Sequence, residues 1–257
     1  MSGQELYEGV IVKLKNKVAI ITGSASGIGK ATALLFAKEG ARIVIADIGE
    51  KGRKVVEEIN KNGKAIFVKC DVSKSNDVKN LINKTIKEFN SLDILINNAG
   101  IYLCKTIEEM SEEEWNRIIN INLKGVFLCS KYAIPHMKKS KGVIVNNAST
   151  LGLKAEPESP AYCASKAGIV NLTRSMAMEY AKYGIRINCV CPGPIDTPLF
   201  RNAFRNNKEL KTYVNEHTIM KRPGKPEEVA NVVLFLASND SSYVIGSCYS
   251  VDGGEAL

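Results

Sequence analysis

Short apolar runs alternate with longer stretches of mixed polarity along the whole chain. Seven of these runs are rich in β-branched residues, and most are nearly continuous in hydrophobicity, which is typical of strands covered on both faces. They lie at 18–22, 42–47, 65–69, 93–97, 142–147, 186–190 and 248–251.

The stretches between these runs are long enough for helices, for example 27–40 and 76–89. In the second, apolar residues recur at Val78, Leu81 and Ile82 and again at 86 and 89, which is helical spacing. Strict alternation of strand and helix predicts right-handed crossovers in an α/β fold. We therefore expect one domain over 1–257, with a doubly wound parallel sheet of about seven strands and helices on both faces.

Two segments interrupt this alternation. Residues 1–16 carry no motif and are interpreted as an N-terminal extension, either a flexible tail or an added strand. The long segment at about 194–225 mixes Phe200, Phe204 and Tyr213 with many charges. Loops of this length in a compact domain are usually functional or disordered, and the scattered apolar residues favour a substrate-binding lid.

Composition excludes several classes of protein. No run approaches the roughly 18 to 20 apolar residues that a membrane span needs, and the N-terminus has no secretory signal. The seven cysteines are scattered, and only Cys189 and Cys191 are close, without the usual zinc spacing. We expect a cytoplasmic protein with reduced thiols and no membrane partner.

The net charge of +8 could indicate a nucleic-acid partner. However, the lysines are spread along the chain among acidic residues and form no single patch. We therefore expect no nucleic-acid binding, although a basic field would help to attract an anionic cofactor.

Three glycines follow the first predicted strand directly, at Gly23, Gly27 and Gly29. They permit a tight turn and the close approach of a phosphate, and the helix that opens there points free N–H groups toward it. Glycines spaced in this way could also serve a turn alone, but their place between a strand and a helix favours a dinucleotide site.

Asp47 ends the second predicted strand, where a carboxylate can accept hydrogen bonds from ribose hydroxyls and repel a 2′-phosphate. Ile48 and Gly49 follow it, so no arginine is there to receive that phosphate. NAD is therefore favoured over NADP, although Asp47 could also cap the next helix. Asp71, after the third strand, could hold the adenine amino group or cap a helix.

These motifs, with others further along, resemble the short-chain dehydrogenase/reductase family from about residue 17 to residue 254. TGxxxGIG lies at 22–29, NNAG at 97–100, an asparagine at 122 in NINLKGVF, a serine at 149, YxxxK at 162–166 and PG at 192–193. The resemblance implies a Rossmann fold and an oxidoreductase that transfers a hydride between a nicotinamide and an alcohol or ketone.

The resemblance also assigns roles to individual residues. The implied catalytic residues are Asn122, Ser149, Tyr162 and Lys166. The implied cofactor residues are Gly23, Ser26, Gly27, Ile28, Gly29, Asp47, Ile48, Asp71, Val72, Asn98, Ala99, Gly100, Tyr162, Lys166, Pro192, Gly193, Ile195 and Thr197.

Tyr162 is the candidate base for the substrate hydroxyl. A free phenol has a pKa of about 10, and a cation nearby favours the phenolate, so Lys166 and an oxidised nicotinamide are expected to lower this pKa. Ser149 can hold the substrate oxygen, or it can simply form a turn. Family resemblance gives Asn122 a water that links Lys166 to solvent, whereas the plain alternative is a satisfied polar residue within a helix. Thr197 could instead cap a helix of the lid.

Two residues depart from the family pattern. Ala148 stands where many relatives have a second serine, and Cys163 follows Tyr162 where serine is common. Neither removes a catalytic group, and we expect Cys163 to pack away from the Tyr162–Lys166 face. His136 and His217 are too few and too far apart in the sequence to suggest a metal site.

The sequence thus favours an NAD(H)-dependent oxidoreductase of secondary alcohols, sugars or ketones. An NADPH-dependent 3-oxoacyl-carrier-protein reductase and a dinucleotide-sensing regulator are the alternatives. The predicted helices at about 111–136 and 161–183 carry apolar residues on more than one face. Because members of the family that the chain resembles commonly pair through these helices as dimers or tetramers, we expect a homotetramer.

Overall fold

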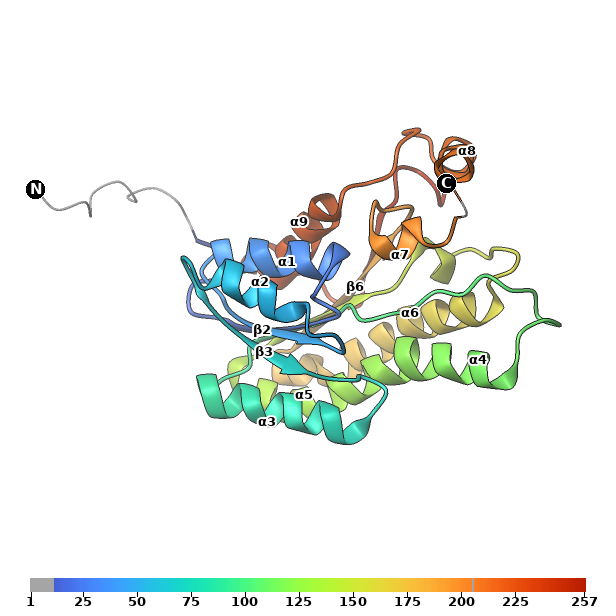
Figure 1. Ribbon diagram of the computed structural model, residues 1–257. Coiled ribbons are helices and arrows are strands. Elements are labelled where there is room, and N and C mark those ends of the chain that lie inside the picture. Colours follow the sequence, from blue (N-terminus) through green and yellow to red (C-terminus); the bar gives the residue numbers. More distant parts are fainter. Residues whose placement is uncertain (1–11, 205) are drawn as a thin grey trace, which may run out of the picture.

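The computed structural model describes residues 12–204 and 206–257, and seven strands of this part of the chain form one sheet. The order is β3-β2-β1-β4-β5-β6-β7, and every neighbouring pair is parallel. The predicted doubly wound parallel sheet is therefore confirmed (Figure 1). The strands are β1 (Val18–Thr22), β2 (Arg42–Asp47), β3 (Lys64–Lys69), β4 (Ile94–Asn97), β5 (Val143–Asn147), β6 (Arg186–Pro192) and β7 (Cys248–Val251).

Helices cover both faces of the sheet, as Figure 1 shows. One layer consists of α1 (Gly27–Lys38), α2 (Gly52–Ile59) and α9 (Pro226–Ala237). The opposite layer holds α3 (Ser75–Phe89), α5 (Gly125–Ser140) and α6 (Pro160–Tyr180), with α4 (Glu112–Ile118) leading into α5. Two further helices, α7 (Pro198–Arg201) and α8 (Asn207–His217), lie within the segment interpreted as a lid.

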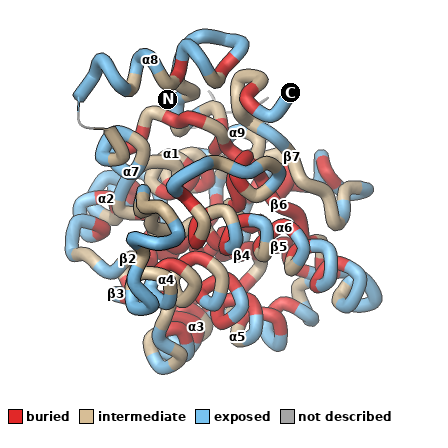
Figure 2. Tube along the Cα trace, turned by 90° about the vertical axis from the view of Figure 1, so that its right-hand side faces the viewer, coloured by how far each residue is buried: buried red, intermediate tan, exposed pale blue. Residues whose placement is uncertain are grey.

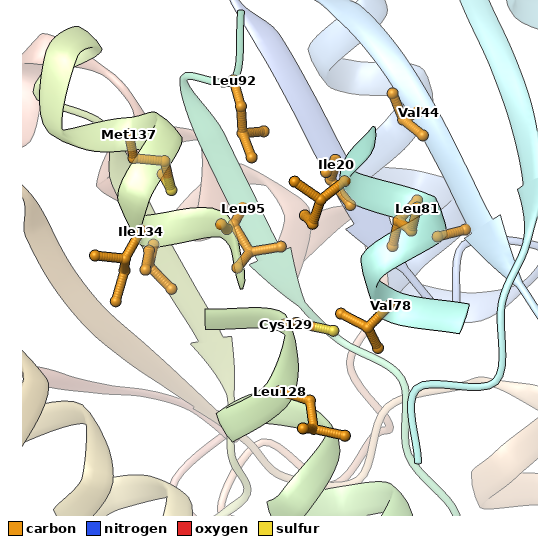
Figure 3. Close-up of a cluster of buried hydrophobic side chains, with 14 of the residues drawn as sticks. Ile20, Val44, Val78, Leu81, Leu92, Leu95, Leu128, Cys129, Ile134 and Met137 are labelled. Carbon is orange, nitrogen blue, oxygen red and sulfur yellow. The ribbon is translucent and has the colours of Figure 1, made fainter. Parts of the chain in front are cut away.

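The period of two along each strand divides the core between these layers. In β1, Ile20 packs into the cluster that contains Val78 and Leu81 of α3, whereas Ala19 and Ile21 pack into the cluster on the α1 side. Figure 3 shows the α3 and α5 side of this core, and Figure 2 shows the buried strands between more exposed helices. Each buried Ile or Leu side chain contributes about 1.5–3 kcal/mol, so the sheet is a firm base for the loops at its edge.

The predicted boundaries are close to those observed. Among the strands the largest difference is at β6, which extends to Pro192 because Cys191 and Pro192 pair with Ser250 and Val251 of β7. That pairing depends on a strand about 60 residues away in the sequence, and local pattern carries no sign of it. All seven cysteines carry free thiols.

The two interrupting segments fare differently. The prediction for residues 1–16 falls mostly on residues 1–11, which lie outside the described part. Leu14 is buried, and its N–H donates to the Glu39 carbonyl at 2.9 Å. The two ends of the 194–225 segment are tied together, because Asp196 N donates to Gly224 O at 2.8 Å and Gly224 N donates to Pro194 O at 2.9 Å. No helix among residues 12–204 and 206–257 has the length and apolar character to cross a membrane.

Candidate active site

A cavity of about 600 Å³ opens at the carboxyl ends of the parallel strands. The chain reverses its direction of winding between β1 and β4, and such a switch point is where open α/β sheets bind ligands. Gly29 and Asn122 are not among the residues that line the cavity. The other predicted site residues line it: Gly23, Ser26, Gly27, Ile28, Asp47, Ile48, Asp71, Val72, Asn98, Ala99, Gly100, Ser149, Tyr162, Lys166, Pro192, Gly193, Ile195 and Thr197.

The glycine loop has the geometry of a phosphate cradle. Gly23 has φ +63°, and a Cβ there would lie 2.8 Å from Ala99 Cα, while a Cβ on Gly29 would lie 2.4 Å from Gly23 O. Asn98 Nδ2 donates to Thr22 O at 2.9 Å and to Gly23 O at 3.1 Å, which fixes the loop to the end of β4. The Ser26 side chain does not cap α1. The first backbone N–H groups of the helix therefore have no side-chain acceptor from Ser26 and can donate to a ligand. The loop therefore fits the pyrophosphate of a dinucleotide.

Asp47 joins the end of β2 to this loop. Its Oδ2 accepts from Ala25 N at 3.0 Å, and its Oδ1 accepts from Gly49 N at 3.0 Å. It does not cap α2, which begins five residues later at Gly52 with Lys51 before it. The carboxylate is therefore placed at the cavity wall by backbone donors.

Asp71 closes a turn ahead of α3. Its Oδ1 accepts from Ser73 N at 3.0 Å and from Ser73 Oγ at 2.6 Å, and these bonds help to lower the pKa of its carboxyl against the opposing effect of burial. The helix itself starts at Ser75, so Asp71 stabilises the turn rather than the first helical residues. The adenine role stays a prediction.

Asn122 occupies a π-helical segment, Ile119–Lys124, between α4 and α5. Its Oδ1 accepts from Ile101 N at 2.9 Å, and its Nδ2 donates to Ile101 O at 3.0 Å and to Ser165 Oγ at 3.2 Å. Such bulges are frequent at functional sites. A Cβ on Gly100 would meet Asn122 Oδ1 at 3.4 Å and Lys166 Nζ at 3.7 Å, so both polar groups approach the same point. The expectation of a polar residue with its partners satisfied is met.

Ser149 follows β5, and Tyr162 and Lys166 lie one turn apart at the start of α6. All three are buried, with exposures of 7%, 9% and 4%. Ser149 Oγ accepts from Leu151 N at 3.1 Å, so the turn-forming alternative also holds. Lys166 Nζ donates to Asn147 O at 2.8 Å and lies 5.4 Å from the centroid of the Tyr162 ring. Tyr162 and Lys166 therefore do not lie on a solvated face of α6.

Burial dominates the pKa values of this pair. It raises the pKa of the Tyr162 phenol well above its ordinary value, with the Ser149 hydroxyl acting in the opposite direction. It lowers the pKa of Lys166 to about 8. From the sequence, we expected Lys166 and an oxidised nicotinamide to lower the pKa of Tyr162. In the protein alone this pKa is raised, so Lys166 by itself does not bring it below its ordinary value.

Thr197 serves as the helix cap considered from the sequence, since its side chain accepts from Phe200 N at 3.2 Å at the start of α7. It also lines the cavity. Cys163 is partly buried, with its Sγ 4.0 Å from Glu156 O, and it is not among the lining residues.

Comparison with known proteins finds relatives over nearly the whole chain. Residues 23–255 match the family profile described as "Enoyl-(Acyl carrier protein) reductase". The chain is 40% identical to the meso-2,3-butanediol dehydrogenase of Serratia marcescens, over 95% of this chain and 96% of that protein. It is 41% identical to a 3-oxoacyl-[acyl-carrier-protein] reductase of Thermotoga maritima, over 95% and 99% of the two chains.

The chain belongs to the short-chain dehydrogenase/reductase family. A solved member, the aldohexose dehydrogenase of Thermoplasma acidophilum in ligand-free form, superimposes with a TM-score of 0.86 at 39% identity, covering 95% of each chain. The chain is accordingly an enzyme, an oxidoreductase acting on CH–OH groups, in a family that uses NAD(P) cofactors.

Several lining residues belong to no family motif, and they were not predicted as site residues. Tyr102 packs edge-on against Tyr162, with ring centroids 5.1 Å apart, and its hydroxyl lies 2.8 Å from Ser159 Oγ. Glu156 and Glu255 approach the cavity from opposite ends of the C-terminal half of the chain. The one available signal was a glutamate-rich loop directly before the YxxxK segment.

Proposed function

We propose that this short-chain dehydrogenase/reductase interconverts a secondary alcohol, or a sugar hydroxyl, and the corresponding ketone with NAD(H). The observation that carries the proposal is one shared cavity. Ser149, Tyr162 and Lys166 line the same space as the glycine loop and Asp47.

The preference for NAD rests on Asp47. Its two oxygens are held by Ala25 N and Gly49 N at the cavity wall, so its charge would meet the 2′-phosphate of NADP. The 3-oxoacyl-carrier-protein reductases of the family favour NADPH, and they are the competing assignment. The glycine loop, Asp71, Val72, Asn98 to Gly100, Pro192, Gly193, Ile195 and Thr197 would hold the rest of the dinucleotide.

The side chains divide the work of moving one proton. When bound, the nicotinamide supplies hydride acceptance or donation. Tyr162 takes the proton of the substrate hydroxyl in oxidation and returns it in reduction. Ser149 holds the substrate oxygen, and the ammonium of Lys166 favours the phenolate of Tyr162. Asn122, beside the same point as Lys166, connects that lysine to solvent.

The support for a proposed assembly is exposed apolar residues on the helices of one layer. Phe127 of α5 is 46% exposed and Met178 of α6 is 84% exposed. We propose that these helices pair in a cytoplasmic homotetramer of one-domain subunits, each with residues 194–225 as its lid. Sedimentation of a monomer at micromolar concentration would contradict the tetramer.

The deciding experiment is a spectrophotometric assay at the NADH band with NAD⁺ or NADP⁺ and a panel of secondary alcohols, diols and sugars. Turnover with NAD⁺ that falls by roughly 10²–10⁴-fold in Tyr162→Phe supports the proposal. Turnover that survives this substitution undiminished would sink the mechanism. Cofactor reduction with NADP⁺ alone would favour the carrier-protein reductase. Cofactor binding without turnover of any substrate would favour a dinucleotide sensor.

A further inference from the structure

Acidic side chains gather at the substrate end of the cavity. Glu156 and Glu158, from the loop after β5, and Glu255, near the end of the described chain, all line it beside Tyr102 and Tyr213. Among the described lining residues the only cations are Lys166 and Arg117. Lys166 is the proposed partner of the proton-transfer tyrosine, and Arg117 is exposed on the last turn of α4. The substrate end is therefore negatively charged.

Glu255 is already fully engaged. Its side chain is 2% exposed, its Oε2 accepts from Thr150 Oγ1 at 2.6 Å, and its Oε1 lies 3.3 Å from Lys154 Nζ. Tyr213 of α8 also donates to its Oε1, at 3.2 Å. Because these partners satisfy and partly neutralise the carboxylate, Glu255 shapes the site without having an oxygen to offer a ligand.

Glu156 differs from Glu255 in this respect. Its Oε2 accepts from the Tyr213 hydroxyl at 3.2 Å, and this one phenolic proton is shared with Glu255. Within residues 12–204 and 206–257 no donor reaches Glu156 Oε1. The side chain is half-buried at the cavity wall, where water or a ligand must supply the missing donor.

We propose that the substrate is a neutral polyhydroxy compound, a vicinal diol or a sugar, whose hydroxyl next to the reacting carbinol donates a hydrogen bond to Glu156. This inference rests on the proposed function, because Tyr162 marks where the reacting carbon lies. A hydroxyl that donates to a carboxylate makes a charge-assisted bond. A substrate carboxylate or phosphate in the same place would face like charge from Glu156 and Glu158.

An aromatic cluster next to Glu156 suits the carbon skeleton of such a substrate. Phe200, Phe204 and Tyr213 pack against one another, with ring centroids 5.1 to 6.2 Å apart, and all three line the cavity. A diol or a sugar ring can place its C–H face on these rings and its hydroxyls toward Glu156. The aromatic cluster and Glu156 together therefore favour a compound that has both an apolar and a hydroxylated part.

The test uses substrates matched in skeleton and different in the neighbouring group. 2-Butanol, 2,3-butanediol and 3-hydroxybutyrate form one set, cyclohexanol, 1,2-cyclohexanediol and 2-hydroxycyclohexanecarboxylate form a second, and aldohexoses are added. With NAD⁺, the expected order of kcat/KM is diol or sugar first, mono-alcohol about 10-fold lower and hydroxy acid lowest. Glu156→Gln, which keeps an acceptor oxygen and removes the charge, should lower the ratio of diol to mono-alcohol kcat/KM and raise the rate with the acid. Glu57→Gln, on the exposed side of α2, is the charge-matched control.

A binding measurement separates this inference from the proposed function. Calorimetric titration of the NAD⁺-loaded Tyr162→Phe variant reports ternary binding without turnover. Tighter binding of diols or sugars than of the matched acids supports the inference, even if the unmodified enzyme oxidises none of these compounds. That lack of oxidation would count against the proposed function and not against the inference. Preference for a hydroxy acid, as expected if Arg117 receives an anion, or no binding of any diol or sugar, overturns the inference. Turnover of mono-alcohols would leave the proposed function standing.

Discussion

The nucleotide end and the substrate end of the cavity differ in which parts of the chain form their surface. At the nucleotide end the surface is largely backbone, because Gly23 and Gly29 leave no room for a Cβ and Asn98 ties the loop to β4. At the substrate end the surface consists of side chains from separate segments, with Tyr213 of α8 meeting Glu156 and Glu255. Tyr162 and Lys166 lie where the two ends join.

This difference implies different tolerances to change. A backbone cradle is defined by excluded volume, so one methyl group can block it. A side-chain wall is defined by which donors face which acceptors, so it can be altered one hydrogen bond at a time. We expect changes at the nucleotide end to act on cofactor affinity and folding together, and changes at the substrate end to act on the substrate alone.

The largest effect is expected at the junction, from Lys166→Met. Without its ammonium the phenolate of Tyr162 loses its cation, so kcat/KM for oxidation should fall by roughly 10²-fold or more. The ascending limb of the pH profile should also move to higher pH. A rate and pH profile unchanged from those of the unmodified enzyme would refute the role of the lysine.

The same substitution should change how stability depends on pH. Burial lowers the pKa of Lys166 to about 8, so above that pH the folded protein has released a proton that the unfolded chain keeps up to its ordinary value near 10.5. The free energy of unfolding should therefore rise with pH in this window, by about 2 kcal/mol between pH 8 and 9.5 relative to Lys166→Met. Urea denaturation of both proteins at these two pH values measures the difference, and parallel behaviour would argue against it.

The next largest effect tests the backbone cradle through Gly29→Ala. The new Cβ would lie 2.4 Å from Gly23 O and 2.5 Å from Asn98 Nδ2, so the loop must move. Cofactor affinity should fall by roughly 10-fold or more, with a loss of about 1–3 kcal/mol in stability. Gly49→Ala is the control, because a Cβ there meets only Asp47 Oδ1, at 3.7 Å. Equal NAD⁺ dissociation constants for the two variants would break the comparison between the two ends.

A smaller effect is expected from Asp47→Ser, which keeps a hydroxyl acceptor near the loop and removes the charge. The ratio of kcat/KM with NADP⁺ to that with NAD⁺ should rise by about 10-fold, the size of one charge-assisted hydrogen bond. Substrate KM should stay the same. An unchanged cofactor ratio would show that Asp47 does not set the preference.

The smallest effect should come from Tyr213→Phe at the substrate end. The substitution removes the phenolic proton shared by Glu156 and Glu255 and keeps the ring on Phe200 and Phe204. Substrate KM should change by about threefold, as expected for one neutral donor, while the NAD⁺ dissociation constant stays constant. A shift of both constants by the same factor would mean that the two ends are not independent.

The two ends also differed in how far the sequence predicted them. The strands and the glycine loop are local patterns with one physical solution, so their positions were predicted within one or two residues. Glu255 could not be found in this way. It reaches the cavity only because the chain beyond β7 packs against Thr150 and Lys154, about 100 residues earlier.

The tie between Thr22 and Asn98 has a consequence for how the chain folds. Asn98 N donates to Thr22 Oγ1 at 2.9 Å, joining residues 76 positions apart, and β1 pairs with β4 over a similar separation. Such non-local pairings form slowly, because the entropy of closing a long loop is lost before any contact can offset it. Pairing of β1 with β2, and of β2 with β3, would leave the glycine loop without its support from β4. Binding of the dinucleotide would thus require that β1 has paired with β4. By mass action it would also stabilise the folded state in which the two halves of the sheet are paired.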